Sequence, residues 1–298
     1  MEITNLYTFV EQVSLLNDEY ENVSKLNPTE FLFRGHSDVK YLLLPNIARG
    51  RNTSCDITIF NGERNLIEMA KCKFPDIFRN DMYPLELLAL LQHYGIPTRL
   101  LDVSENALAA LYFACCSKPD ADGEVFVFLN NNSHVANAPV ISAIADTCVL
   151  TREAPYSLEH FYTAALNQPY FTEQRHIFDI CKDSIDGAKW IEDCCSKPLF
   201  VYAPIHTLRQ QLQQGRYILF PNKITDNYLG LGEKAFETII DPMSKEHDCI
   251  KKRYIIKKES KKKILRDLEL CGISESTLFC DSIDKVCSGI IGKVKRML

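Results

Sequence analysis

The chain has 298 residues, of which 46% are hydrophobic and 24% are charged, and its formal net charge is −5. A chain of this length and hydrophobic content forms one large domain or two ordinary ones with a substantial core. The modest charge does not indicate a nucleic-acid partner. The sequence contains no run of about 18 apolar residues, so we expect no membrane-spanning helix.

The twelve cysteines and the N-terminus indicate the compartment. The cysteines lie within apolar runs such as Ala114–Cys116. Structural zinc sites usually contain Cys-x-x-Cys pairs, and this sequence has none. Residues Met1–Thr4 do not begin a basic region followed by an apolar stretch, so no signal peptide is indicated. We therefore expect reduced core thiols, no metal site and a cytoplasmic protein.

The first half of the chain contains well-marked helical and strand-like patterns. Apolar residues recur at helical spacing near the N-terminus, and prolines and glycines mark the ends of later elements. Pro84 is typical of a helix start, and Gly95 is typical of a helix C-terminal cap. We expect helices at about 4–17, 65–74, 84–94 and 106–116, with Ser104 as the N-cap of the last, and strands at 31–35 and 123–129.

The second half contains strand-like runs without regular intervening helices, which argues against a doubly wound parallel sheet. The pattern of residues 130–195 does not predict clear elements. Neither an internal repeat nor a low-complexity linker divides the chain. We predict a single α+β domain over 1–298 with a core at about 25–280 and a central mixed or antiparallel sheet flanked by helices. The expected elements are strands at 199–203, 216–220, 236–240 and 254–256, and helices at 260–270 and 281–298.

Polar residues are concentrated between Gln92 and Asp102, where an apolar helix ends. Burying such groups without partners costs roughly 1–3 kcal/mol each. Two interpretations remain open. The polar groups satisfy one another, with Arg99 paired to Asp102 and His93 capping the helix, or they line a cleft. In a cleft, Arg99 and the N-terminus of the next helix form an anion site.

An arginine also follows the apolar run Phe31–Phe33, and a buried guanidinium needs acceptors. Arg34 either pairs with a core carboxylate, such as Glu63 or Glu86, or binds a ligand anion that Gly35 allows to approach closely.

Two further segments are polar and have two interpretations each. Gln214 and Gly215 either present amide groups and open backbone to a flat polar ligand or belong to a solvated helix. The lysine-rich segment 245–266 is interpreted as a solvated strand edge and helix face, or as a phosphate-binding surface.

These motifs together resemble the FRG-domain family, which is named for the triplet Phe33-Arg34-Gly35. The run Gln92–Ala114 (QHYGIPTRLLDVSENALAALYFA) resembles the central signature of that family. Gln213–Phe220 (QQGRYILF) and Lys263–Phe279 (KILRDLELCGISESTLF) resemble its later strand and closing helix. Val103 and Ser104 stand where the family has Trp-Thr. The resemblance implies a bacterial or phage protein, in some cases with a role in phage defence or as a toxin.

A more distant likeness is to the arginine-specific mono-ADP-ribosyltransferases, in which the arginine of an aromatic-Arg-Gly strand holds NAD. Those enzymes carry a catalytic glutamate in a later motif, whereas Gln213–Gly215 lacks one. The likeness implies NAD as a substrate, with Glu63 and Glu173 as other candidate acids. The expected catalytic residues are His93, Asp102 and Glu86, and the expected nucleotide-binding residues are Arg34, Gly35, His36, Tyr94, Thr98, Arg99, Gln214 and Gly215.

Two functions follow from these resemblances. One is a toxin or defence effector that transfers ADP-ribose from NAD or cleaves NAD, with a protein target, antitoxin or trigger as a partner. The other is a non-catalytic module that senses a nucleotide or a protein. A metal-dependent nuclease is the weakest alternative, because carboxylates are not clustered in the signature.

Overall fold

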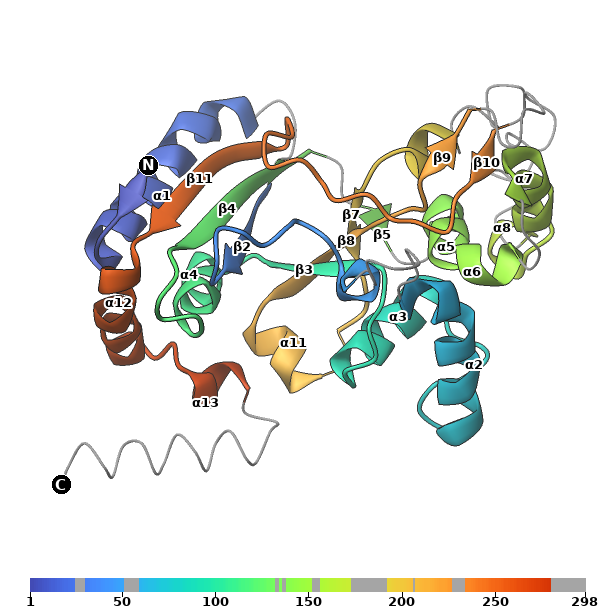
Figure 1. Cartoon of the computed structure of the whole chain (residues 1–298), viewed down its shortest axis with the longest axis horizontal. Coiled ribbons are helices and arrows are strands. Elements are labelled where there is room, and N and C mark those ends of the chain that lie inside the picture. The colour runs from blue at the N-terminus through green and yellow to red at the C-terminus, as the bar shows by residue number, and fades with distance from the viewer. Residues whose placement is uncertain are drawn as a thin grey trace.

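The computed structural model describes residues 1–24, 30–50, 59–131, 134–135, 138–151, 156–172, 192–205, 207–226 and 234–279. An eight-stranded sheet crosses these residues in the order β1-β11-β4-β2-β3-β8-β7-β5 (Figure 1). The edge pairs β1–β11 and β5–β7 are parallel, and the other pairs are antiparallel. This mixed sheet with its packed helices confirms the predicted α+β class.

The strands of the main sheet are short at both edges and longer in the middle. They are β1 Glu2–Ile3, β2 Glu30–His36, β3 Leu100–Ser104, β4 Gly123–Asn130, β5 His134–Val135, β7 Leu199–Tyr202, β8 Gly215–Leu219 and β11 Ile250–Ile256. A separate three-stranded sheet contains β6 Tyr156–Ser157, β10 Ala235–Phe236 and β9 Ile224–Thr225.

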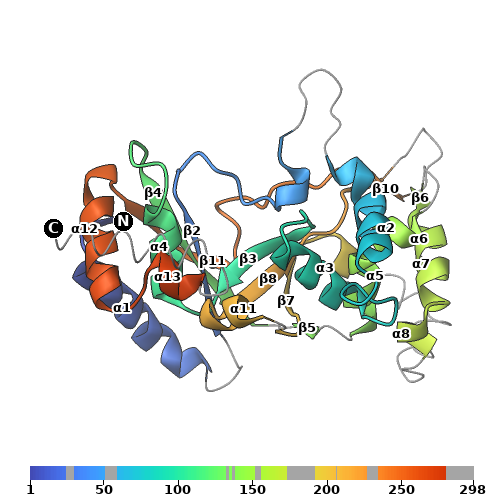
Figure 2. The same ribbon diagram turned by 90° about the horizontal axis from the view of Figure 1, so that it is seen from below.

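The helices gather in two groups at opposite ends of the sheet (Figure 2). Around β4 and β11 lie α1 Leu6–Ser24, α4 Ala107–Cys115, α12 Lys258–Leu270 and α13 Glu275–Leu278. The other end carries α2 Glu63–Lys73, α3 Pro84–His93, α5 Pro139–Ala145, α6 Thr147–Leu150, α7 Leu158–Leu166 and α8 Pro169–Thr172. The helix α11 Leu208–Leu212 lies between them, and the 3-10 turns are η1 Asn46–Ala48 and η2 Ile59–Gly62.

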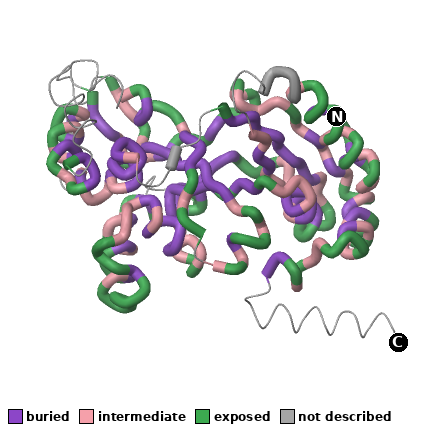
Figure 3. The backbone as a smooth tube through the Cα atoms, turned by 180° about the vertical axis from the view of Figure 1, so that it is seen from behind, coloured by how far each residue is buried: buried purple, intermediate pink, exposed green. Residues whose placement is uncertain are grey.

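The central strands are buried on both faces (Figure 3). Successive side chains of a strand point to opposite faces. Val125 and Val127 of β4 therefore pack with α4 and α12, while Phe126 and Phe128 pack against the segment around η1. A third apolar cluster joins α3 and α5 to Leu100 of β3 and to the neighbouring strands.

The sheet opens between β2 and β3. β2 pairs with β4 along all seven of its residues, but it pairs with β3 only through Phe33 and Ser104. On β2 the pairing with β3 therefore stops at Phe33, directly before Arg34. On β3 it includes only Ser104, two residues after Asp102. This opening positions the candidate site.

Most predicted elements are present, with three corrections. The strand β3 was not expected. The strand expected at 236–240 is only Ala235–Phe236. The N-cap of α4 is Asn106 rather than Ser104, since the Asn106 side chain accepts from two backbone N–H groups of the first turn. The expected burial of α4 is confirmed.

Two further sequence expectations concern the ends of the chain and the membrane. The N-terminal helix is present and extends to Ser24. The helix expected at 281–298 lies outside the described residues. In the described ranges, no helix combines the length and apolar content needed to cross a membrane.

Candidate functional site

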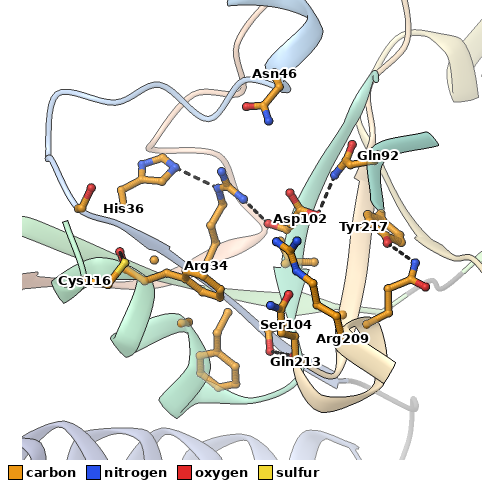
Figure 4. Close-up of a pocket in the computed structure, with 18 of the residues that line it drawn as sticks. Arg34, His36, Asn46, Gln92, Asp102, Ser104, Cys116, Arg209, Gln213 and Tyr217 are labelled. Carbon is orange, nitrogen blue, oxygen red and sulfur yellow. Dashed lines mark hydrogen bonds between the residues drawn. The ribbon is translucent and has the colours of Figure 1, made fainter. Parts of the chain in front are cut away.

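A cavity of about 490 Å³ lies where β2 and β3 separate (Figure 4). Its walls come from β2, β3, β8, α4 and α11, from the end of α3, and from the turn that follows β2. Segments distant in the sequence therefore meet at one place. Six expected site residues line it: Arg34, Gly35, His36, His93, Asp102 and Gly215.

Arg34 is held in place by groups that carry no negative charge. Its Nη1 donates to the backbone carbonyl of Asp102, and its Nε donates to Nε2 of His36 at 3.0 Å. Burial lowers the pKa of Arg34 to about 10, so the guanidinium stays charged at neutral pH. No other side-chain hydrogen bond joins Arg34 to the described part of the chain, and the remaining N–H groups of its guanidinium are available to a ligand in the cavity.

His36 acts as a neutral acceptor. The Nε–H of an arginine can only donate, so Nε2 of His36 accepts, and the ring proton lies on Nδ1. That nitrogen is 3.3 Å from Oε1 of the buried Glu124. Burial lowers the pKa of His36 to about 4, although the Glu124 hydrogen bond opposes the shift. A line of contacts from Glu124 through His36 thus orients Arg34.

Glu124 is fully buried and ionised. Burial alone raises its pKa, but hydrogen bonds from His36, Lys245 and Arg253 bring that pKa below the usual value. Lys261 is also buried, and its Nζ donates to three backbone carbonyls at 2.7–3.2 Å. The expectation of a solvated lysine-rich face at 245–266 is therefore wrong for Lys261, whereas Lys252, Lys262 and Lys263 are exposed.

The carboxylate of Asp102 is exposed and is oriented by the end of α3. Gln92 Nε2 donates to Asp102 Oδ1 at 2.7 Å, and Thr98 Oγ1 donates to Gln92 Oε1. Both interpretations of the polar stretch therefore hold in part: Thr98, Gln92 and Asp102 form a network, and Gln92, His93 and Asp102 line the cavity.

Positive charge predominates among the described lining residues. Arg34, Arg49 and Arg209 line the cavity, and Asp102 is its carboxylate. Arg49 is fixed by a 2.9 Å hydrogen bond from Nε to the Leu44 carbonyl, and burial lowers its pKa. In Figure 4, Arg34 and Arg209 approach Asp102 from β2 and α11. An excess of guanidinium groups over carboxylates favours a ligand with phosphate or carboxylate groups.

Arg99 does not reach this cavity, and the predicted anion site built on it is wrong. Its side chain is fully buried, with Nε donating to Glu63 Oε1 at 2.9 Å and Nη2 bonded to the other oxygen of the same carboxylate. Nη1 donates to Asn222 Oδ1 at 2.9 Å. Glu63, another candidate acid, forms this core ion pair and does not line the cavity.

Four other expected residues also lie away from the cavity. Tyr94 is exposed and packs on Phe78, and Thr98 is buried behind Gln92. Gln214 is exposed in the turn before β8, at φ 45°. Glu86 is in the first turn of the ten-residue α3, about 10 Å along the axis from His93. Glu173 lies outside the described residues.

Gly35 lines the cavity, but its lack of a side chain serves the core. A Cβ atom there would lie 1.9 Å from the Ala110 carbonyl oxygen and 2.7 Å from the Ala114 nitrogen. Gly35 therefore allows α4 to pack directly on β2, rather than allowing a ligand to approach. In the triplet, Phe33 packs into the core and Arg34 faces the cavity, while Gly35 leaves room for the backbone of α4.

Sequence reasoning missed several lining residues. Arg49 and Asn46 lie in a turn without a recognisable motif, and Arg209 was interpreted with its glutamine-rich neighbours. Tyr217 was expected only as a strand residue, yet it lines the cavity and its hydroxyl accepts from Gln210 Nε2 at 2.8 Å.

Comparison with known proteins bears on one part of this chain. A sequence model of the FRG domain matches residues 29–123. This match supports the resemblance to the FRG-domain family over that segment. The chain matches no curated protein and no solved structure, so the likeness to mono-ADP-ribosyltransferases has no support from these comparisons. The FRG match includes Arg34, His93 and Asp102, whereas Arg209 and Tyr217 lie beyond it.

Proposed function

We propose that this FRG-domain protein binds an NAD-like nucleotide in the cavity between β2 and β3 and breaks its nicotinamide–ribose bond. The observation that carries the proposal is the excess of three arginines over one carboxylate among the described lining residues. A diphosphate matches this charge, and the cavity volume of about 490 Å³ is within the usual range for small-molecule sites.

Arg34 is the best candidate for holding a phosphate. His36 and the Asp102 carbonyl fix the guanidinium before a ligand arrives, so little side-chain entropy is lost on binding. Tyr41, Phe113 and Tyr217 add aromatic surface to the walls, which suits a flat base or a nicotinamide ring.

Asp102 and His93 take the chemical roles in this proposal. The glycosidic bond breaks with its electron pair passing to the nicotinamide nitrogen, and positive charge develops on the ribose. The Asp102 carboxylate, held by Gln92, stabilises that charge. Water or an acceptor group then attacks the ribose carbon, and His93 at the cavity wall accepts the proton released by the nucleophile.

A second function is a non-catalytic nucleotide sensor. It is favoured by the absence of glutamate among the described lining residues and by the hydrogen bond that Asp102 already makes to Gln92. In the first function the protein acts in the cytoplasm as a toxin or defence effector, with a protein target or antitoxin as its partner. In the second it is a sensor module in phage defence that responds to a trigger.

The test combines binding and product analysis on the purified chain. NAD, ADP-ribose, ATP and oligonucleotides are screened by thermal shift, and nicotinamide release from NAD is followed by chromatography. We expect stabilisation by NAD and ADP-ribose and nicotinamide release by the wild type. Asp102→Asn should retain ADP-ribose binding and lose release.

Other outcomes separate the two functions. Binding without nicotinamide release under any condition supports the sensor. No shift with any nucleotide at millimolar concentration contradicts both. Induced expression in bacteria provides a matched assay, because an enzyme toxin slows growth only as the wild type and not as Asp102→Asn.

A further inference from the structure

Arg209 differs from the other cavity arginines in how it is held. It lies on α11, and its guanidinium makes no hydrogen bond to any residue within the described ranges. Instead, its central carbon lies 4.4 Å from the centre of the Phe279 ring. A guanidinium stacked on an aromatic face keeps the N–H donors at its edge available for an anion.

Phe279 contacts the cavity wall in a second place. Its ring is 8% exposed and meets the Phe113 ring edge-on, with centres 6.0 Å apart. The preceding residue, Leu278, accepts a 3.0 Å hydrogen bond at its carbonyl from Gln213 Nε2. Arg209, Phe113 and Gln213 all line the cavity, so the turn at the end of α13 supports one wall.

We propose that Phe279 is a positioning residue that holds Arg209 at the cavity for binding a phosphate-bearing ligand. The ligand class rests on the proposed function, whereas the placement of Arg209 does not. Both residues lie outside the matched segment 29–123. The C-terminal part of the chain thus completes an anion site whose first arginine belongs to the FRG domain.

The first measurement needs no ligand. Phenylglyoxal modifies accessible arginines, and the rate at Arg209 is followed by peptide mass spectrometry on the full chain. Phe279→Leu removes the ring face and should increase the rate at Arg209 severalfold, whereas Phe279→Tyr should leave it near the wild-type value. Phe60→Leu is the matched control, because its ring lies 5.3 Å from the buried Arg99 instead.

The second measurement is the dissociation constant of ADP-ribose by calorimetry. Phe279→Leu should weaken binding roughly threefold to tenfold, in line with the loss of a cation–π contact. The double variant Phe279→Leu/Arg209→Gln should bind no more weakly than Arg209→Gln alone. This non-additivity separates positioning of Arg209 from general damage to the wall.

Each outcome decides the proposal. Unchanged Arg209 reactivity in folded Phe279→Leu, or additive losses in the double variant, overturns it. If Phe279→Leu does not fold, Phe279→Met provides the same comparison with a side chain that fills more of the space. If ADP-ribose does not bind the wild type, the proposed function fails, and the phenylglyoxal rates still decide the role of Phe279.

Discussion

Arg34 and Arg99 carry the same charge, and both were expected in one nucleotide site, but their surroundings differ. Arg34 donates to a neutral imidazole and a backbone carbonyl, so a ligand anion can still pair with its charge. Arg99 is fully buried against the carboxylate of Glu63. The difference shows that the charge of the acceptors, rather than their presence, decides whether a buried guanidinium is already paired with a carboxylate.

The largest expected effect is on the structural side of this comparison. Replacing Arg99 by Met leaves the Glu63 carboxylate buried without its partner, which should lower the free energy of unfolding by about 3–5 kcal/mol. Urea denaturation measures the loss. The variant Arg99→Met/Glu63→Leu removes both charges and should recover much of it. If the single variant loses less than about 1 kcal/mol, the ion pair is not structural.

The two regions should also respond to pH with opposite sign. His36 has a folded pKa of about 4, below its unfolded value near 6.5, because burial disfavours its charged form. Its stabilising contribution is therefore present above pH 6.5 and is lost as the pH falls toward 4, on the order of 3 kcal/mol in total. Near Arg99, burial raises the pKa of Asp146 to about 7, so its contribution is present below about pH 4 and is lost as the pH rises through 7.

Two variants separate these contributions in melting curves between pH 4 and pH 8. His36→Gln keeps an acceptor for Arg34 and should lose less stability than the wild type on acidification. The melting temperature of Asp146→Asn should rise relative to that of the wild type as the pH rises. Identical pH profiles for His36→Gln and the wild type would show that His36 is not held neutral.

The third effect is on binding. Arg34→Ala removes a charge-assisted contact worth about 1.5–3 kcal/mol and should weaken ADP-ribose binding about tenfold or more. Its unfolding free energy should change by less than that of Arg99→Met, because no buried carboxylate loses its partner. Both quantities are measured on the same preparation. A variant that melts far lower yet binds normally when folded would make Arg34 a core residue.

The smallest expected effect concerns the glycine beside Arg34. Gly35→Ala forces a Cβ against the α4 backbone, and overpacking of this kind costs typically 1–3 kcal/mol of stability. Calorimetry of the folded variant should give nearly normal ADP-ribose binding. Gly95→Ala is the control: it meets no atom within 4 Å, and only its φ of 85° opposes a side chain. A folded Gly35→Ala that no longer binds would assign the glycine to the ligand.

Local patterns predicted many of the elements and several of the cavity residues. The end of α3 followed from Gly95, and the burial of α4 followed from its nearly continuous apolar sequence. The strand β3 was missed because Asp102 interrupts its apolar residues. Leu101 and Val103 nevertheless face one apolar cluster, and Leu100 faces another. This alternation becomes clear only once the neighbouring strands are known.

Residue type and spacing determined by themselves that a polar cluster follows α3, that Phe33-Arg34-Gly35 ends an apolar run and that the chain resembles the FRG family. Tertiary structure decided which arginine meets a carboxylate. Arg99 and Glu63 are 36 positions apart, and Arg209 and Phe279 are 70 apart. Charge and hydrophobicity are local properties of a sequence. Desolvation and pairing depend on which distant segments the packed sheet brings into contact.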